Sequence, residues 1–434
     1  MMKKIPFFLF AAPLLLMAAG AGRAPESLPR PQAEAAAESG DDAFLEDLSR
    51  RSFRYFADNA DPGTGLVLDR VRADGSLMDE GHRYAASSAS TGFGLTALCV
   101  GAGRGWISRE EAASRVRTTL GFFAEKAARE HGWFYHWMDS RTGERIWNSE
   151  ISSIDTALLL AGALTAKQCF SDDPAIGELA DKIYRGLDFK WMLNGDKELL
   201  SHGWTPENGF IAYRWDTHSE LMLLYVLGLG SPSSPLPASS WRAWKRPVVH
   251  YGETSFIGGA PPLFIHQYSH AWVDFRGKKD GGTDWFDNSV IATGANRAMC
   301  EALSTRFSGY GPDMWGVTAS DSASGYKAWG GPPAASDIDG TVVPCAAGGS
   351  LMFTPELSLP ALKAMKLAYG GKVYGLYGFA DAFNPSTGWI DADVIGIDAG
   401  ITLLSAENLR GGSVWKWFMA NKEITAALSA AGIK

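Results

Sequence analysis

The sequence predicts an all-α protein built as an (α/α)6 barrel (α/α toroid), in which an outer ring of helices encloses an inner ring and long loops shape an acidic cleft. Three observations predict this class. Apolar residues recur at helical spacing in roughly a dozen segments. Some of these segments are apolar on every side, and others carry one polar face. The repeated strand and helix units of a parallel sheet are absent from the sequence.

The N-terminal region has the pattern of an export signal. In residues 1–24, two lysines precede an apolar run that ends in small residues. The run is short and soon broken, so an uncleaved anchor is only the alternative and no integral membrane domain is expected. Residues 25–41 are rich in Pro, Ala and acidic side chains, which is typical of a disordered spacer. We therefore expect a periplasmic or secreted protein in which residues 42–434 form a single domain.

The predicted helices follow one another along this domain, and segments rich in Gly, Pro and Asp separate them. They span residues 41–60, 84–103, 108–130, 152–170, 172–193, 217–231, 237–246, 287–307, 355–370, 395–412, 413–420 and 422–432. Four contain runs that are apolar or small all round, as expected for inner helices: residues 156–164, 221–230, 289–299 and 399–408.

The composition excludes several classes of protein. A net charge of −8 argues against nucleic acid or an anionic membrane surface as the partner. The four cysteines lie far apart without metal-ligand spacing, so we expect no metal and no cofactor; buried thiols are the first interpretation, and one or two disulfides are the alternative. The eight histidines form no HExxH motif, and no GxSxG motif accompanies them, which disfavours zinc and serine hydrolases. The expected state is a monomer.

Acidic residues stand where the predicted inner helices begin. Helices of such a barrel begin at its mouth, so the residues before each apolar run should line one pocket. Glu150 precedes the start of the helix of residues 152–170, where no capping role requires it, and is interpreted as a pocket residue. Asp155 completes an S-x-x-D capping box with Ser152, so helix capping and a pocket role remain equal alternatives for it.

Glu220 has the same ambiguity, because it closes a T-x-x-E box that begins at Thr217. Its flanking residues Arg214, Trp215 and His218 combine polar and aromatic groups in one short stretch. Such a cluster suits ligand binding better than helix capping, so catalysis is the favoured interpretation for Glu220 and ligand binding the favoured one for its three neighbours.

Two later loops supply further candidates. The segment "WGVTASDSASGYKAWGGPP" is rich in Gly and Pro and is interpreted as a shaped substrate platform. In "YGFADAFNP", residues 377–385, the acid and the amide form either a turn before the proline or part of the pocket. The candidate binding residues of the two loops are Trp315, Asp321, Tyr326, Trp329, Phe383 and Asn384, and Asp381 is a candidate acid.

An acidic, aromatic pocket without a metal suits glycoside cleavage. In that reaction one carboxylic acid protonates the leaving oxygen and a second carboxylate acts on the water or the anomeric carbon. The chemistry therefore favours a glycosidase over other hydrolases.

Five segments of the chain resemble the glucoamylase-like (glycoamylase) domain family, which includes glycoside hydrolase family 144. They are "ISSIDTALLLAGAL", "WGVTASDSASGYKAWGGPP", "DGTVVPCAAGGSLMFTPE", "YGLYGFADAFNP" and "GIDAGITLLSAENLRGGSVWKWFM", within a match from about residue 53 to residue 433. The resemblance implies an (α/α)6 barrel and an inverting, endo-acting hydrolase of β-1,2-glucan that releases sophoro-oligosaccharides. Cys345 stands where we expect an aromatic residue.

The resemblance also implies catalytic roles for the acidic residues. It places Glu220 as the general acid and Glu150 in the pocket, with Asp381 or Asp398 as the opposite acid and with Asp155 and Asp321 in reserve. An exo-acting or other β-glucan hydrolase on the same barrel is the first alternative. A non-catalytic glycan-binding protein of an uptake system is the second.

Overall fold

The computed structural model describes residues 39–259, 262–335 and 337–434. The predicted signal and most of the predicted spacer lie outside the described residues. Helix α1 (Ser39–Asp58) begins three residues before the expected start of the domain. Within the described residues, no helix is both long and apolar enough to cross a bilayer.

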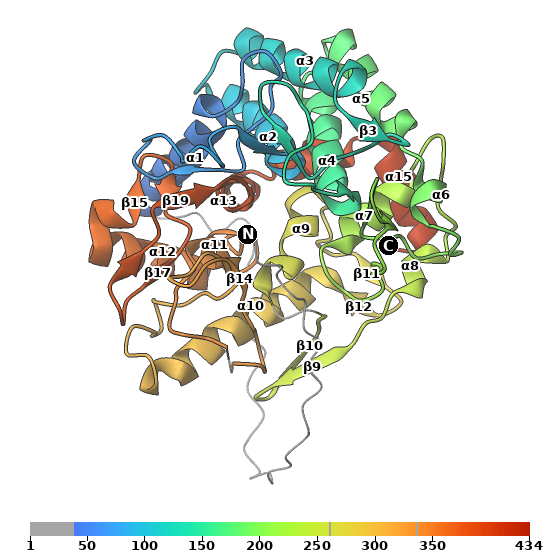
Figure 1. The fold of residues 1–434 in the computed structure, drawn as a ribbon. Coiled ribbons are helices and arrows are strands. Elements are labelled where there is room, and N and C mark those ends of the chain that lie inside the picture. The colour runs from blue at the N-terminus through green and yellow to red at the C-terminus, as the bar shows by residue number, and fades with distance from the viewer. Residues whose placement is uncertain (1–38, 260–261, 336) are drawn as a thin grey trace.

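Buried helices form the centre of the molecule. Helices α2 (Ser88–Arg104), α4 (Ser153–Cys169), α7 (Leu221–Leu229), α9 (Tyr268–Trp272) and α13 (Gly396–Arg410) are buried over most of their length. Each packs on the next in this order, and α13 packs back on α2, as Figure 1 shows. The helix-rich fold and the buried character of the predicted runs in α4, α7 and α13 are therefore confirmed.

Amphipathic helices surround this centre (Figure 1). Helix α1 packs on α2 and α13, α3 on α2 and α5, α5 on α4, and α15 on α7. The bounds of the remaining helices are α3 (Arg109–Glu125), α5 (Pro174–Gly186), α6 (Phe189–Met192), α8 (Ser240–Ala243), α10 (Trp285–Ala302), α11 (Pro344–Gly348), α12 (Pro355–Tyr369), α14 (Ser413–Met419) and α15 (Lys422–Ala431), with 3-10 turns η1 (Leu263–His266), η2 (Leu303–Thr305) and η3 (Gly370–Lys372).

One predicted inner helix is not buried all round, which corrects the prediction for residues 289–299. They belong to α10, and Ile291 on that helix is 37% exposed. Helix α10 packs against strand β10 and the turns η1 and η2, so one of its faces meets solvent. Small residues such as Ala and Gly make a helix look apolar without requiring that it be enclosed.

Several predicted helix boundaries also shift. The segment of residues 172–193 divides into α5 and α6, residues 237–246 form only the four-residue α8, and residues 108–130 end as a helix at Glu125. The short helices α9 and α11 were not predicted, because neither is long enough to show a helical period.

Short antiparallel strands join the helices, and three of them lead directly into inner helices: β2 into α2, β6 into α4 and β19 into α13. The pairs are β1 (Arg70–Arg72) with β19 (Asp393–Ile395), β2 (Ala85–Ser87) with β5 (Trp137–Asp139), β3 (Arg129–Glu130) with β4 (Trp133–Phe134), β9 (Val248–Tyr251) with β10 (Thr254–Ile257), β11 (Lys279–Asp280) with β12 (Thr283–Asp284), β13 (Ala319–Ser320) with β14 (Lys327–Ala328), β15 (Tyr374–Gly375) with β16 (Gly378–Phe379) and β17 (Phe383–Asn384) with β18 (Trp389–Ile390); β7 (Gly203–Thr205) lies between β6 (Ile151–Ser152) and β8 (Gly209–Phe210).

Two glycines let α2 and α4 approach closely. A Cβ atom on Gly92 would lie 2.3 Å from the carbonyl oxygen of Leu158, and one on Gly162 would lie 2.1 Å from the carbonyl oxygen of Gly92. Neither position leaves room for a larger residue, because both overlaps are with backbone. The spacing of the first two inner helices therefore depends on these glycines.

The four cysteines are all buried and free, as the first interpretation of the sequence expected. No disulfide forms among them.

Candidate active site

A first acidic group lies where α4 begins. Ser152 caps the helix: its Oγ accepts a hydrogen bond from the Asp155 backbone N–H at 3.3 Å and donates one to Asp155 Oδ2 at 2.5 Å. The second oxygen of Asp155 lies 3.6 Å from Nε2 of His136, and Nδ1 of His136 lies 3.0 Å from Oε1 of Glu150. The capping alternative for Asp155 is thus met, and the same side chain also faces a charged neighbour; its role in a substrate pocket stays a prediction.

His136 sets the charge of this group. Burial alone would lower the pKa of His136, but the charge of Asp155 and the hydrogen bond and charge of Glu150 outweigh it and raise that pKa to about 9. Burial alone would raise the pKa of Glu150, yet the hydrogen bond from His136 leaves it below the ordinary value. Burial dominates at Asp155 and raises its pKa. At neutral pH the group therefore holds an ionised Glu150 beside a protonated His136.

Glu220 stands immediately before α7 and makes no capping hydrogen bond with its side chain. The T-x-x-E box is therefore not formed, which removes the capping alternative. Ser269 in α9 donates a hydrogen bond to the Glu220 carbonyl oxygen at 2.8 Å and so fixes the backbone at this point. Burial raises the pKa of the Glu220 carboxyl to about 7, and the charge of Asp155 acts in the same direction. Near neutral pH this group can hold a proton and give it up.

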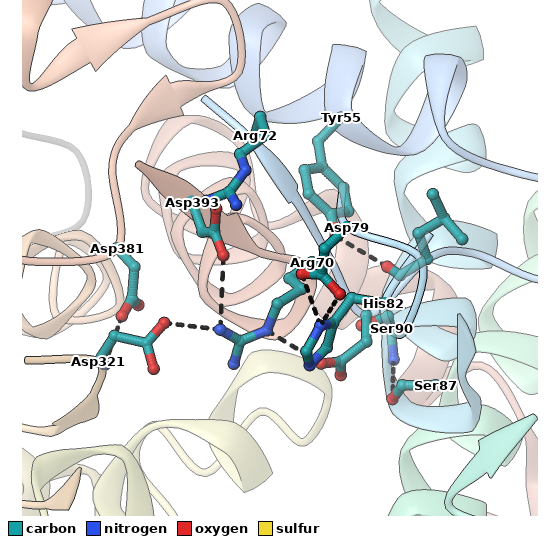
Figure 2. Close-up of polar contacts among 12 residues, drawn as sticks. Tyr55, Arg70, Arg72, Asp79, His82, Ser87, Ser90, Asp321, Asp381 and Asp393 are labelled. Carbon is teal, nitrogen blue, oxygen red and sulfur yellow. Dashed lines mark hydrogen bonds and ion pairs between the residues drawn. The ribbon is translucent and has the colours of Figure 1, made fainter. Parts of the chain in front are cut away.

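A second acidic group gathers around Arg70, which Figure 2 shows between Asp321 and Asp393. Nη1 of Arg70 lies 2.7 Å from Oδ2 of Asp321 and 3.6 Å from Oδ2 of Asp393, and Arg72 binds Asp393 at 2.6 Å. The pairing of β1 with β19 brings these arginines and Asp393 together. The backbone N–H of Asp321 donates to Oδ2 of Asp381 at 2.7 Å. The pair Arg70 and Asp321 thus orients the carboxyl of Asp381.

Asp381 and Asp398 form a buried carboxyl pair behind Asp321. Burial raises the pKa of both groups, and the charge of Asp398 raises that of Asp381 further. Cys345 donates a hydrogen bond from Sγ to Oδ1 of Asp398 at 3.2 Å. The thiol therefore has a polar role at the position where an aromatic residue was expected. Burial also raises the pKa of nearby Asp391 to about 7, with the charges of Asp321 and Asp393 adding to the effect.

Two residues connect the acidic groups electrostatically. Asp69 lies 3.8 Å from Nε of Arg70, and its charge acts on the pKa of both His136 and Asp398. Tyr268 in α9 is buried, which raises the pKa of its phenol, and the charges of Asp398 and Glu220 raise it further. These shared charges indicate that the two acidic groups lie within electrostatic range of each other.

Two sets of side chains have the spacing of metal ligands. His136, Glu150 and Asp155 form one set and Asp321, Asp381 and Asp391 the other, with each set of ligand atoms within 4.8 Å. Their chemistry does not favour a cation. A protonated imidazole has no lone pair for a metal, and Asp321 is already bound by a guanidinium. The absence of a metal stays a prediction.

The predicted aromatic platform is corrected in part. Trp315, Trp329 and Phe383 are fully buried, so none presents a ring face to a ligand. Trp329 donates from Nε1 to Oγ of Ser320 at 2.9 Å and helps to hold the β13–β14 hairpin. Tyr326 on that hairpin remains 56% exposed, and the pKa of its phenol is raised by partial burial first and by the charges of Asp398 and Asp381 next. Tyr326 is therefore the one of these aromatic candidates whose ring a ligand can reach.

The predicted binding cluster before α7 is corrected for its two rings, which pack in the core, whereas the part-buried Arg214 holds a neighbouring loop. Arg214 donates to the carbonyl oxygens of Leu193 and Leu199, each at 2.7 Å. Trp215 is buried and stacks on His202, and His218 is buried and stacks on Trp285. Their polar and aromatic composition resembles a ligand site, but close packing uses the same residue types.

Of the two alternatives for Asn384, a turn before Pro385 or a pocket residue, the structure shows the turn. Its Oδ1 accepts hydrogen bonds from the backbone N–H groups of Ser386 and Thr387, at 3.0 and 3.2 Å. This is an Asx turn that contains Pro385, and the side chain is 4% exposed.

Residue spacing could not identify three members of the site. Arg70 lies 251 residues from Asp321, and His136 lies 14 residues from Glu150 across a loop, so neither pairing has a local pattern. Asp391 had a weak signal, because it stands in the acidic segment before α13.

Comparison with known proteins identifies the family. A family model named Glycoamylase, described as "Putative glucoamylase", matches residues 212–422. An endo-β-1,2-glucanase from Chitinophaga pinensis, solved with sophorotriose and glucose, is 30% identical; the match covers 92% of this chain and 99% of that chain with a TM-score of 0.85. The chain belongs to the glycoamylase family of glycoside hydrolases. The resemblance that the sequence motifs indicated is thereby confirmed.

Other members of the family agree with this assignment. A crystal structure from Bacteroides fragilis, described as a "putative glucoamylase", is 32% identical, with 93% of this chain and 99% of that chain covered and a TM-score of 0.84. An exo β-1,2-glucooligosaccharide sophorohydrolase (non-reducing end) from Parabacteroides distasonis is 28% identical over 422 residues. That match covers 88% of this chain and 57% of the relative, so the chain spans just over half the length of this curated relative.

Proposed function

We propose that this glycoamylase-family protein hydrolyses β-1,2-glucan, cutting within the chain with inversion at the anomeric carbon and releasing sophoro-oligosaccharides. One observation carries the proposal: the surroundings of two carboxyl groups near the starts of inner helices push their pKa values apart. Burial raises the pKa of Glu220 to about 7, whereas the hydrogen bond and charge of His136 hold the pKa of Glu150 below its ordinary value. Carboxyl pairs whose pKa values are pushed apart are the usual acid and base of glycoside cleavage.

The roles follow from these pKa values. Glu220 donates its proton to the leaving glycosidic oxygen, and Glu150 receives the proton of the attacking water, directly or through a substrate hydroxyl. Asp381 and Asp398 share a buried environment that favours their neutral forms, so they suit hydrogen bonding to a sugar better than base catalysis. The ion pair of Arg70 with Asp321 orients Asp381, because the backbone N–H of Asp321 donates to that carboxyl. The two acidic groups would then line one cleft.

The fold and location belong to the same proposal. In the proposed (α/α)6 barrel, α11, which packs on α13, would be the sixth inner helix beside the five of the central ring. The pattern of residues 1–24 supports export to the periplasm or the medium. We expect the working form to be a monomer without metal or cofactor.

Incubation of the purified protein with linear β-1,2-glucan tests the activity. We expect new reducing ends and a ladder of sophoro-oligosaccharides at early times. Glu220→Gln should lower kcat by at least about a hundredfold and leave glucan binding intact, because the amide keeps the size of the carboxyl but holds no acidic proton. Retarded migration in a glucan gel without any cleavage by the wild type would instead identify a binding protein.

Exo-action is the second candidate, because the Parabacteroides distasonis relative is named an exo sophorohydrolase. An exo-enzyme of that kind releases one disaccharide from the first minutes and lowers the viscosity of the polymer slowly. An endo-enzyme lowers viscosity quickly and yields mixed lengths. The distribution of early products therefore separates the two.

A further inference from the structure

Trp147 is an exposed aromatic residue beside the first acidic group. Its side chain is 42% exposed, although tryptophan usually loses most of its surface on folding. Its ring lies 5.6 Å from that of Trp137, and the ring of Trp137 stacks on His136 at 3.4 Å between centroids. His136 in turn binds Glu150. A short row of rings therefore connects Trp147 to the ionised glutamate.

The backbone under Trp147 is strained. Trp147 and Asn148 have φ angles of 54° and 53°, in the left-handed region, which asparagine tolerates but a bulky tryptophan rarely adopts. Such a conformation of a tryptophan lowers stability and persists only where neighbours enforce it. The tryptophan is thus kept in place at a cost in stability.

An arginine enforces this conformation. Arg145 donates to the carbonyl oxygen of Asn148 at 2.7 Å and to that of Ser149 at 2.5 Å. Glu207 binds the same guanidinium at 2.6 Å, and the ring of Tyr135 lies beneath it at 5.2 Å. These contacts of Arg145 hold the backbone of the turn, and none of them involves the indole of Trp147.

Among the described residues, no ring stacks in parallel on the indole. The rings of Trp137 and His82 meet it at steep angles of 61° and 62°. Tyr84 is similarly exposed, but the guanidinium of Arg141 covers its ring at 3.6 Å. Trp147 differs from Tyr84 because no cation of the described residues covers its ring, and 42% of its side chain is exposed.

We propose that Trp147 is a binding platform on which a glucosyl ring of the substrate stacks, at a subsite adjoining Glu150. The C–H bonds of a glucose ring form an apolar face that matches an indole, and an ordered aromatic ring binds it with little loss of entropy. This inference rests on the proposed function, since it names the residue that grips the glucan next to the acids.

Binding of β-1,2-glucan by inactive Glu220→Gln protein tests the platform without interference from cleavage. In that background, Trp147→Ala should weaken binding about tenfold, as expected when one stacking contact is lost. Trp147→Phe should keep most of the affinity. Trp417→Ala, which removes a part-buried tryptophan on α14 that lies against Gly103, is the matched control and should bind normally.

Trp147→Gly separates binding from structure. Glycine adopts the left-handed conformation freely, so this variant should melt at or above the temperature of the parent while binding glucan as weakly as Trp147→Ala. A merely structural tryptophan would give the reverse, with lower thermal stability and unchanged affinity. Normal binding by Trp147→Ala, with normal cleavage by the wild type, overturns the platform alone. A wild type that neither binds nor cuts β-1,2-glucan overturns the proposed function and the platform together.

Discussion

At the scale of single residues, the two glutamates differ only in their surroundings. Glu220 has no cationic partner among the contacts that shift its pKa, and burial raises that pKa to about 7. Glu150 has a protonated histidine at 3.0 Å, which outweighs the effect of its own partial burial. The proposed acid and the proposed base thus differ because a positive charge lies beside Glu150 and none acts on Glu220 among the groups that shift its pKa.

The pH dependence of activity should report on Glu220. We expect kcat/KM for β-1,2-glucan to fall as pH rises through about 7, because the proton needed by the leaving oxygen is lost. A pH–rate profile with purified protein measures this. The residual activity of Glu220→Gln should lack that alkaline limb; a limb of unchanged position in the variant would assign it to another group.

The stability contributed by His136 should also depend on pH. Its folded-state pKa of about 9 lies above the ordinary value of 6.5, so its contribution is fully present below pH 6.5 and is lost as pH rises through about 9. His136→Gln should therefore lower the melting temperature strongly at pH 6 and much less at pH 9.5. Thermal melts of both proteins at the two pH values check this; an equal loss at both would show that the charge of His136 is not what stabilises the fold.

At the scale of elements, short strands and small residues set where the inner helices begin and how closely they pack. Strands β6 and β19 each deliver the chain directly into a buried helix, which places Asp155 and Asp398 in the first turns of α4 and α13. Helices α2 and α4 then approach to backbone contact through Gly92 and Gly162. The position of the first acidic group depends on this contact, because α4 carries Asp155.

Replacement of Gly162 by alanine tests the close packing of these helices. The new Cβ would overlap the carbonyl oxygen of Gly92, so we expect a loss of about 2 kcal/mol or more in unfolding free energy. The matched control is Gly177→Ala in α5, where nothing lies within 4 Å of the added atom. The control should gain about 0.5–1 kcal/mol through the lower entropy of its unfolded state. Chemical denaturation of the three proteins measures both effects.

At the scale of the whole molecule, the two halves of the chain complete each other. The family model matches residues 212–422, yet α13 from that region packs on α1 and α2 from the N-terminal half. The second acidic group also joins the two halves of the chain, because Arg70 from the first half binds Asp321 from the second.

A fragment of residues 212–422 should therefore not fold by itself. It exposes the apolar faces of α7 and α13 that α4, α1 and α2 cover in the whole chain. We expect the fragment to lack a cooperative thermal transition and the protein from residue 39 onward to show one. Circular dichroism during heating distinguishes them, and a sharp transition for the fragment would show that its half is an independent domain.

Local pattern predicted much of this protein. Helical period and apolar runs predicted α1, α3, α4, α7 and α13, because burial on one side or on all sides leaves a trace in residue spacing. The candidate acids Glu150, Asp155, Glu220 and Asp398 were predicted for the same reason, since each stands at or near a recognisable helix start, and their catalytic roles stay predictions. The aromatic candidates failed more often: Trp315 and Trp329 are core residues, because a loop rich in Gly and Pro can be packed as densely as a helix.

The sequence by itself determined the helical class, the family and the acids at the helix starts, because these depend on residues that are neighbours along the chain. Only the tertiary structure decided which ionisable groups lie close enough to shift one another's pKa. His136 between Glu150 and Asp155, Arg70 against Asp321, and Cys345 beside Asp398 are contacts between segments far apart in sequence. Electrostatic interactions depend on distance in space and on burial, and neither is encoded in the spacing of residues along the chain.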